Sequence, residues 1–457
     1  MTRLAPGLAA AKAVGVLSRA ARRGGGTSLP GKVLTRVEPA AIGLLAGRLA
    51  HGSALISATN GKTTTAAMVA SVLEGRGARL VHNRAGANMA GGVASALADA
   101  ARGGGRRVDG DTGLFEVDEF WVGQLLGELR PRAVLLANLF RDQLDRYGEL
   151  ETIGDRWKVA VDGLPAATAL VLNADDPLVA DLGRERGAVY FGVDDDALAM
   201  GAMQHAADSK HCRRCGHPYA YDAIYLGHLG RYHCPDCGQR RPEPDVRASA
   251  VELRGIRSAA FSLDTPEGSA RVELPLPGLY NVYNALAAAA LCRALGASLA
   301  EIVAGLEAVA PAFGRAETLE LRGRPASLLL IKNPAGANEV LRTLALEDGE
   351  LDVLGVLNDN IADGRDVSWV WDADWELLAP RLRRMVCAGT RAAELAVRLK
   401  YAGVDPERLE VVEDLGTALD RALAGGSGPL YVLPTYTALI GLRELLARSG
   451  EAREFWR

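Results

Sequence analysis

The nine-residue segment Ser57–Thr65, Ser-Ala-Thr-Asn-Gly-Lys-Thr-Thr-Thr, constrains this chain more than any other stretch. The apolar run Ala54–Ile56 before it predicts a buried strand, and residues 66–74 have the apolar spacing of a helix. A glycine-bearing loop between a strand and a helix suits phosphate binding, because backbone N–H groups and the helix N-terminus face the anion. In that role Lys62 neutralises phosphate charge and the Thr63 hydroxyl ligates Mg²⁺.

The loop departs from the general phosphate-loop pattern at Ile56, where that pattern has a glycine, so an ordinary strand–helix turn is the alternative. However, Thr-Asn-Gly-Lys-Thr-Thr is the form of the loop in the Mur ligase superfamily, which includes the folylpolyglutamate synthases. The chain resembles that superfamily, with Ala58 in place of the usual glycine. The resemblance implies ATP and Mg²⁺ as cofactors. The nucleotide-binding residues that it implies are Thr59, Asn60, Gly61, Lys62, Thr63, Thr64, Asn281 and Arg315.

Three carboxylates, Glu116, Asp118 and Glu119, end the next predicted strand. Carboxylates gathered at the end of a strand repel one another unless a cation lies among them. In Mur-type ligases a Glu-x-Asp-Glu at this point holds the Mg²⁺ that bridges ATP and substrate. The resemblance therefore implies Glu116 as a catalytic residue and, with Thr63, as a magnesium ligand. A solvated acidic turn is the alternative.

Further segments match the superfamily less completely. Asn138–Gly148 resembles its Asn-x-x-x-Asp-His-Leu-Asp loop, which implies that Asn138, Asp142 and Asp145 face the nucleotide and metal. Residues 173–176, Asn-Ala-Asp-Asp, resemble a turn close to the nucleotide, although such turns are common after strands.

Two later matches supply the remaining nucleotide contacts. Asn281 lies in a Gly-x-His-Asn-x-x-Asn type of motif, with Tyr280 replacing the histidine, at a predicted helix start where it can act as a cap. Arg315 is the arginine of a Gly-Arg-x-Glu type of motif that ends the ATP domain in relatives, and it is implied to reach the γ-phosphate. The loop Asn83–Met89 is equally consistent with a site wall and with a surface turn, and Lys158 matches a carbamylated lysine of some relatives too weakly to be assigned.

Two Cys-x-x-Cys-Gly knuckles predict a closed zinc ribbon. Eighteen residues separate the two pairs, a spacing within the range of four-cysteine sites. Four thiolates complete the shell of a structural Zn²⁺, and the glycine of each knuckle lets the backbone fold over the sulfurs. The expected ligands are Cys212, Cys215, Cys234 and Cys237. A redox pair and a nucleic-acid-binding ribbon are the alternatives, since arginines flank the knuckles.

Composition excludes several classes of protein. A net charge of −4 argues against a general nucleic-acid binder, and no apolar run approaches the roughly 20 residues of a transmembrane segment. The cysteine spacing indicates metal binding rather than disulfides, which predicts a reducing and therefore cytoplasmic location. Met1–Arg23 predicts a short amphipathic helix; a signal peptide fits less well because Lys12 interrupts the apolar core.

The length of 457 residues suggests two or three domains in an α/β fold. We expect an N-terminal helix and linker over residues 1–45, with a flexible link at Gly24–Gly31. A Mur ligase-type P-loop ATPase domain should follow over 46–317, with the zinc ribbon inserted at about 205–245. A Rossmann-like C-terminal α/β domain should occupy 318–457. Its predicted strands are Ala326–Lys332, Leu351–Leu357, Arg384–Ala388 and Pro429–Leu433.

Two segments of the C-terminal domain, Leu357–Asp372 and Tyr431–Leu439, resemble one branch of the superfamily. With the zinc ribbon they resemble the MurT branch, the ligase subunits of the enzyme that amidates D-glutamate in lipid II. The resemblance covers almost the whole chain. It implies a ligase of peptidoglycan biosynthesis that converts the D-glutamate α-carboxylate to D-isoglutamine through an acyl phosphate. It also implies a GatD-type glutaminase subunit as the partner that supplies ammonia.

The start of the C-terminal domain agrees with ammonia as the nucleophile. Relatives that add amino acids begin this domain with Asp-Tyr-Ala-His-Asn-Pro, whereas Ile331–Gly336 lacks the acid and the histidine. Hydrolysis of glutamine by this chain itself would need a nucleophilic cysteine with a histidine partner. Cys292 and Cys387 instead have the surroundings of core thiols. A stand-alone Mur or folylpolyglutamate-type ligase that adds an amino acid is the alternative, and a nucleic-acid-coupled P-loop protein is a second one.

The resemblance also implies that this subunit donates an aspartate to the Cys–His pair of its partner. We choose Asp366 in the Asp-Gly-x-Asp-x-Ser-Trp loop, with Asp363 and Asp359 as alternatives. A turn rich in aspartate would explain one carboxylate, but hardly a loop with five aspartates beside three tryptophans.

Overall fold

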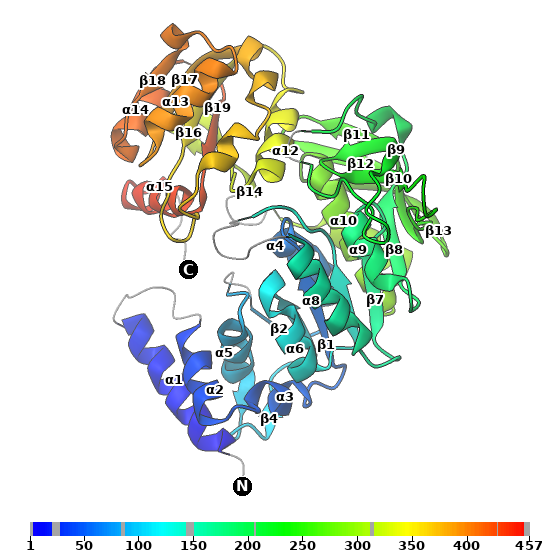
Figure 1. The fold of residues 1–457 in the computed structure, drawn as a ribbon. Coiled ribbons are helices and arrows are strands. Elements are labelled where there is room, and N and C mark those ends of the chain that lie inside the picture. The colour runs from blue at the N-terminus through cyan, green and yellow to red at the C-terminus, as the bar shows by residue number, and fades with distance from the viewer. Residues whose placement is uncertain are drawn as a thin grey trace.

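Two β-sheets, each with helices on both faces, form the body of the protein, and a small ribbon projects from the larger one (Figure 1). In this computed structural model the described residues are 3–20, 28–83, 87–142, 150–204, 207–310, 315–426 and 428–451. Among the helices described, none combines the length and the apolar character needed to cross a bilayer.

The larger sheet has nine strands in the order β13-β12-β11-β8-β7-β6-β1-β5-β2. The pairs from β2 through β11 are parallel, and β12 and β13 extend the edge in antiparallel fashion. Its strands are β1 (Ser53–Ser57), β2 (Leu80–His82), β5 (Thr112–Glu116), β6 (Ala133–Leu136), β7 (Ala169–Asn173), β8 (Val189–Val193), β11 (Val246–Arg254), β12 (Ser258–Thr265) and β13 (Gly268–Leu274).

The strand predicted at Ala54–Ile56 is confirmed as β1 at the centre of this sheet. Successive side chains of a strand point to opposite faces, and Ile56 and Leu55 accordingly belong to two different apolar clusters. Both faces are therefore covered, which explains why the strand reads as a continuous apolar run.

Helices cover the two faces of the larger sheet. One face packs against α4 (Lys62–Gly75), α10 (Leu279–Ala294) and α11 (Leu299–Glu307). The remaining elements of this part are α3 (Ala41–Ala46), α5 (Ala90–Ala100), α6 (Val122–Leu129), α8 (Leu150–Asp162), α9 (Pro177–Ala180), β3 (Ala101–Arg102) and β4 (Arg107–Val108). The helix predicted after the phosphate loop is confirmed as α4, and it begins at Lys62.

The N-terminal region packs against α5, a helix of the larger sheet's layer, through α1 (Leu4–Ala20) and α2 (Leu29–Val37). The flexible link predicted at Gly24–Gly31 is wrong in its last three residues, because Leu29–Gly31 form the first turn of α2. The Gly31 N–H donates to Ser95 Oγ of α5 at 2.8 Å, so tertiary packing overrides the loop-like composition. The beginning of the predicted link lies outside the described residues.

The smaller sheet has the order β14-β15-β19-β16-β17-β18, with β14 antiparallel and the other pairs parallel. Its strands are β14 (Arg315–Leu321), β15 (Arg324–Leu329), β16 (Leu351–Val356), β17 (Leu382–Ala388), β18 (Leu409–Val411) and β19 (Leu430–Pro434). Its helices are α12 (Pro334–Leu344), α13 (Ala392–Tyr401), α14 (Leu415–Ala424) and α15 (Tyr436–Arg448).

The four strands predicted for this part are present. The largest boundary error is at the end of the first strand, which was predicted to reach Lys332 and ends at Leu329. The chain leaves the sheet there because Asn333 caps α12 and accepts a hydrogen bond from the Gly336 N–H at 2.8 Å. β14 and β18 are additional edge strands.

The ribbon is an antiparallel hairpin, β9 (Ala220–Leu226) and β10 (Leu229–His233), with a cysteine knuckle on each side of it. It lies beside the larger sheet, near β8 and β11 (Figure 1).

Candidate active site and zinc centre

The predicted phosphate loop lies at the carboxyl edge of the larger sheet. The segments that follow β1, β5 and β6 meet there: Val117 N–H donates to the Ile56 carbonyl at 2.8 Å, and Thr59 N–H donates to the Asn138 carbonyl at 3.0 Å. Open α/β sheets bind ligands at this edge. The fold therefore gathers the phosphate loop, the carboxylates and the Asn138 loop at one place.

Gly61 fixes the backbone of the loop. Its φ is +87°, and a Cβ there would overlap the Asn284 side-chain oxygen. A non-glycine residue would therefore be strained and would collide with α10. The glycine lets α4 begin at the next residue, and no side-chain hydrogen bond from the Gly61 cap position occupies the helix N-terminus.

Lys62 is buried, and its Nζ lies 2.8 Å from Glu119 Oε2. Burial by itself lowers the pKa of Lys62, but Glu119, with Asp118 and Glu116 near it, outweighs burial and raises that pKa. Burial would raise the pKa of Glu119, yet Lys62 and Lys332 hold it below its ordinary value. Lys62 thus carries its charge inside the site and is paired with a carboxylate. Sequence reasoning carried over only Glu116 from this acidic cluster and missed Glu119.

Thr63 and Glu116 face each other, and the Thr63 hydroxyl donates to Glu116 Oε1 at 3.1 Å. Hydroxyl and carboxylate oxygens are the ligand types that Mg²⁺ prefers, so this pair fits the magnesium site predicted from the sequence. The Asn83 side chain fixes the backbone of Glu116. Its Oδ1 accepts the Glu116 N–H at 3.0 Å and its Nδ2 donates to the Glu116 carbonyl at 2.8 Å. The sequence left the Asn83 loop undecided, and residues 84–86 lie outside the described residues.

The Asn60 backbone and the Asn138 side chain form a pair of hydrogen bonds. The Asn60 N–H donates to Asn138 Oδ1 at 2.9 Å, and Asn138 Nδ2 donates to the Asn60 carbonyl at 3.0 Å. Thr59 is buried, and its hydroxyl oxygen accepts the Phe140 N–H at 3.1 Å. Thr59 therefore positions the neighbouring loop in this structure. Asp145 lies outside the described residues.

The C-terminal part reaches directly onto the phosphate loop through Lys332 and Asn333. Lys332 Nζ lies 2.5 Å from Asp142 Oδ2 and 3.3 Å from the Thr59 carbonyl oxygen. The Asn333 and Asn60 side-chain amides exchange hydrogen bonds of 3.0 and 3.3 Å. These polar contacts bring a second cation close to the phosphate loop from the other sheet.

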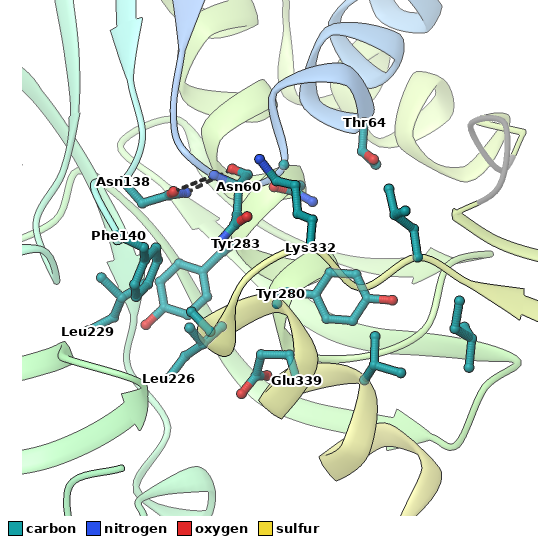
Figure 2. Close-up of a pocket in the computed structure, with 17 residues that line it drawn as sticks. Asn60, Thr64, Asn138, Phe140, Leu226, Leu229, Tyr280, Tyr283, Lys332 and Glu339 are labelled. Atoms are coloured by element: carbon teal, nitrogen blue, oxygen red, sulfur yellow. Dashed lines mark hydrogen bonds between the residues drawn. The ribbon is translucent and has the colours of Figure 1, made fainter. Parts of the chain in front are cut away.

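A cavity opens between these parts, beside the phosphate loop (Figure 2). Its lining includes Asn60, Gly61, Thr64, Phe140, Tyr280 and Asn284. Asn281 lies behind that wall: it is buried, donates to the Pro277 carbonyl at 2.8 Å and accepts from Asn284 Nδ2 at 3.0 Å. The predicted cap at Asn281 is wrong, because α10 begins at Leu279 with Gly278 in the cap position. Arg315 is the first residue of β14, and its side chain lies outside what the structure describes.

The turn at residues 173–176 is buried and forms hydrogen bonds with residues next to the site. Asp176 caps α9 and accepts the Leu139 N–H at 2.9 Å. Asp175 accepts the Tyr283 hydroxyl at 2.6 Å and pairs with Arg241 at 2.6 Å. Burial raises the pKa of Asp175 although these partners oppose that shift. The turn therefore supports Tyr283, which lines the cavity.

The four ribbon cysteines come together as predicted. The ligand atoms of Cys212, Cys215, Cys234 and Cys237 all lie within 4.8 Å of one another. Two Sγ–Sγ distances are 3.5 and 3.4 Å, which suits a tetrahedral ion with Zn–S bonds of about 2.3 Å. Gly216 and Gly238 have φ values of +78° and +73°, so each knuckle turns through a conformation that favours glycine. The donor set fits zinc.

Four of the ribbon arginines tie the ribbon to a helix and to turns beside the larger sheet. Arg214 lies 2.8 Å from Asp181, and Arg241 lies 2.6 Å from Asp175. Arg213 and Arg231 also form ion pairs, with Asp155 and Asp196. Side chains neutralised in this way do not form a basic surface, which counts against the nucleic-acid-binding alternative.

The aspartates of the Leu357–Asp372 loop have different surroundings. Asp363 is buried and accepts the Thr437 N–H at 2.8 Å and its hydroxyl at 2.5 Å, so it ties the loop to α15. Asp359 lies 2.8 Å from Arg391 Nε. Asp366 is exposed, and hydrogen bonds from Ser368 lower its pKa. Asp366 lines a hollow that also contains Asp142 and Lys332.

The two remaining cysteines are core thiols, as predicted. Cys292 of α10 and Cys387 of β17 are fully buried. Burial raises the pKa of both thiols, that of Cys387 to about 12. Neither has the activated thiolate that a glutaminase nucleophile needs. Lys158, left unassigned above, lies in α8 and pairs with Asp162 at 2.5 Å.

Two known protein families match different parts of the chain. Residues 56–233 match the Mur ligase middle domain, and residues 330–439 match the MurT ligase C-terminal family. The MurT subunit of lipid II isoglutaminyl synthase (glutamine-hydrolyzing) from Streptococcus pneumoniae is 33% identical over 434 residues, which is 94% of each chain. Its counterpart from Staphylococcus aureus strain N315 is 33% identical over 93% of this chain and 94% of the relative.

A solved structure agrees on the fold. A pseudomurein peptide ligase type C from Methanothermus fervidus superimposes with a TM-score of 0.67 at 22% identity, over 87% of this chain and 78% of that one. The chain thus has the Mur ligase fold, as the sequence predicted. Together with the identity over nearly the full length of the curated relatives, this shows that the chain belongs to the MurT family of Mur ligase-like proteins.

Proposed function

We propose that this chain is the ATP-dependent ligase subunit of a lipid II isoglutaminyl synthase. It amidates the D-glutamate α-carboxylate of the stem peptide to D-isoglutamine, with ammonia from a GatD-type glutaminase subunit. The observation that carries the proposal is the near full-length identity with curated MurT subunits, combined with a phosphate loop whose lysine, threonine and glutamate are assembled at one sheet edge.

The residues divide the chemistry as follows. A carboxylate must be activated before ammonia can replace its oxygen, and phosphoryl transfer from ATP gives an acyl phosphate. Lys62 and the N-terminus of α4 bind the phosphates. Glu116 and Thr63 would hold Mg²⁺, which would neutralise charge on the transferring group. Ammonia then forms the new C–N bond, phosphate leaves with the C–O bond electrons, and the proton that the nitrogen loses passes to the released phosphate.

The start of the C-terminal domain supports ammonia rather than an amino acid. Lys332 and Asn333 lie against Asp142 and Asn60, in the segment where amino acid-adding relatives carry an acid and a histidine. Ammonia needs no site for an α-carboxylate or a side chain.

We further propose that Cys212, Cys215, Cys234 and Cys237 hold one structural Zn²⁺, and that Asp366 completes the catalytic Cys–His pair of the glutaminase. The exposure of Asp366 supports this choice over Asp363, which is buried against Thr437. The cytoplasmic location predicted from the cysteine pattern stays a prediction.

The purified chain should be incubated with ATP, Mg²⁺ and lipid II, with either ammonium salt or a mixture of amino acids. Amidated lipid II, detected by mass spectrometry with ammonium alone, is the expected result. A stem peptide lengthened by an amino acid would instead support the stand-alone ligase. Lys62→Ala serves as the matched inactive control.

A further inference from the structure

The tip of the zinc ribbon reaches the cavity beside the phosphate loop. Leu226 ends β9 and Leu229 begins β10, and both line that cavity together with Phe140. Figure 2 shows the three side chains together on one side of the cavity, with Tyr280 on another side. The cysteine knuckles lie beyond the opposite end of the hairpin, since Cys234 follows the last residue of β10.

The hairpin tip is fixed to the phosphate loop through Phe140. His228, between the two leucines, is fully buried, and its ring centroid lies 4.7 Å from that of Phe140. The Phe140 N–H in turn donates to Thr59 Oγ1 at 3.1 Å. A continuous set of contacts therefore runs from the ribbon to the loop expected to bind phosphate.

A second set of contacts joins the hairpin to α12 of the C-terminal part. Arg342 Nη1 donates to the Tyr225 carbonyl oxygen at 2.8 Å and lies 3.2 Å from Glu339 Oε1. Glu339 is buried and lines the same cavity. The cavity is thus walled by the phosphate loop, the ribbon hairpin and α12.

We propose that the ribbon hairpin is part of the nucleotide site, and that Leu226, Leu229 and Phe140 form the apolar wall against which the base of ATP packs. The inference rests on the proposed function, because it takes ATP as the ligand. Asn60, Gly61 and Thr64 of the phosphate loop and the start of α4 line the same cavity. A planar base has apolar faces that gain from burial against leucine and phenylalanine. The ribbon then contributes to nucleotide affinity as well as to stability.

The test compares two ligands, ATP and inorganic tripolyphosphate, by isothermal titration of the full chain. Leu226→Ala and Leu229→Ala should each weaken ATP binding by about tenfold, because each removes buried methyl groups from the base wall. Both should bind tripolyphosphate within about twofold of the wild type, since it has no base. Zinc content is measured for every variant, so that loss of metal is recognised.

Two further variants serve as a control and as a second test of the hairpin. Leu263→Ala is the matched control: Leu263 of β12 is buried in the same apolar cluster and lies outside the set of cavity-lining residues, so ATP binding should stay normal. Arg342→Met leaves the core leucines in place and removes the bond to the hairpin; it should weaken ATP binding by about three- to tenfold. If the leucine variants do not fold, Arg342→Met still tests whether the hairpin contributes to ATP binding.

Normal ATP affinity in Leu226→Ala, Leu229→Ala and Arg342→Met would overturn the inference. Equal loss of ATP and tripolyphosphate in the leucine variants would also overturn it, because the effect would not depend on the base. Lys62→Ala distinguishes failure of the proposed phosphate site from failure of the proposed base wall. If Lys62→Ala binds ATP and tripolyphosphate normally, the phosphate site of the proposed function is wrong, independently of the results for the ribbon variants.

Discussion

Replacing Glu119 with glutamine tests whether Lys62 is held by a carboxylate that the nucleotide must displace. Lys62 Nζ and Glu119 Oε2 are 2.8 Å apart, and the two side chains are only 9% and 12% exposed. Removing one partner of a buried ion pair costs about 3–5 kcal/mol, since the other charge stays buried. Asp118 and Glu116 also act on the pKa of Lys62, so we expect a loss near the lower limit, about 3 kcal/mol.

The assay is thermal unfolding of the wild type and Glu119→Gln, with and without ADP and without added Mg²⁺. A loss of about 3 kcal/mol lowers the melting temperature of a domain of roughly 150–250 residues by about 6–12 °C. A bound phosphate gives Lys62 a new counter-charge, so saturating ADP should reduce the difference between the two proteins by more than half. Glu185→Gln is the matched control, because Glu185 is 64% exposed and lies 3.6 Å from a surface lysine; it should change stability little.

The pH dependence of this difference has a defined sign. The pKa of Glu119 is lowered in the folded chain, so its contribution is complete above its ordinary value of 4.5 and is lost as the pH falls through the folded pKa. The pKa of Lys62 is raised, so its contribution is complete below 10.5 and is lost as the pH rises through the folded pKa. The difference should therefore be constant from about pH 6 to 9. If saturating ADP leaves it unchanged, Lys62 does not turn to the phosphates and the reasoning is refuted.

Three other outcomes can be checked on the same protein. Lys62→Ala should lower ATP-dependent amidation by on the order of 10²–10³-fold, whereas Lys158→Ala, a lysine paired at the surface of α8, should keep normal turnover; similar rates in both would contradict the phosphate-loop assignment. Thr63→Ala should raise the Mg²⁺ concentration needed for half-maximal turnover, measured by titration, and an unchanged titration would remove Thr63 from the metal site. Elemental analysis should find one Zn²⁺ per chain, with Cys212→Ser unstable and poor in zinc; a folded, zinc-free wild type would count against the ribbon assignment.

Local patterns sufficed for much of the fold. The apolar run of β1, the glycine of the phosphate loop and the helical spacing of α4 are adjacent in the chain, so periodicity and turn chemistry predicted them. The cysteine knuckles were predictable for the same reason, since each glycine turn is set by its own two cysteines. By contrast, Leu29–Gly31 looked like a link because Pro and Gly are common there, and only packing on α5 makes it helical.

The residues that sequence reasoning missed or left undecided act across long separations. Asn83 holds Glu116 from 33 positions away, and Glu119 pairs with Lys62 from 57 positions away. Lys332 and Asn333 reach the phosphate loop only because the two sheets pack together. The Glu-x-Asp-Glu pattern did carry a signal for Glu119. A third carboxylate in the same site as the phosphate-loop lysine can form an ion pair with it, as Glu119 does with Lys62. No local pattern pointed to the ribbon leucines as cavity residues.

Ammonia release and amide formation should take place at different sites, and a change at Asp366 can separate the two reactions. The measurement is lipid II amidation by Asp366→Asn in complex with the glutaminase subunit, once with glutamine and once with ammonium salt. An acid that orients a catalytic histidine typically contributes on the order of 10⁴-fold to turnover. We predict a loss of that order with glutamine and near-normal amidation with ammonium, since the substitution leaves the phosphate loop unchanged. Equal loss with both nitrogen sources, or no loss with either, would contradict it.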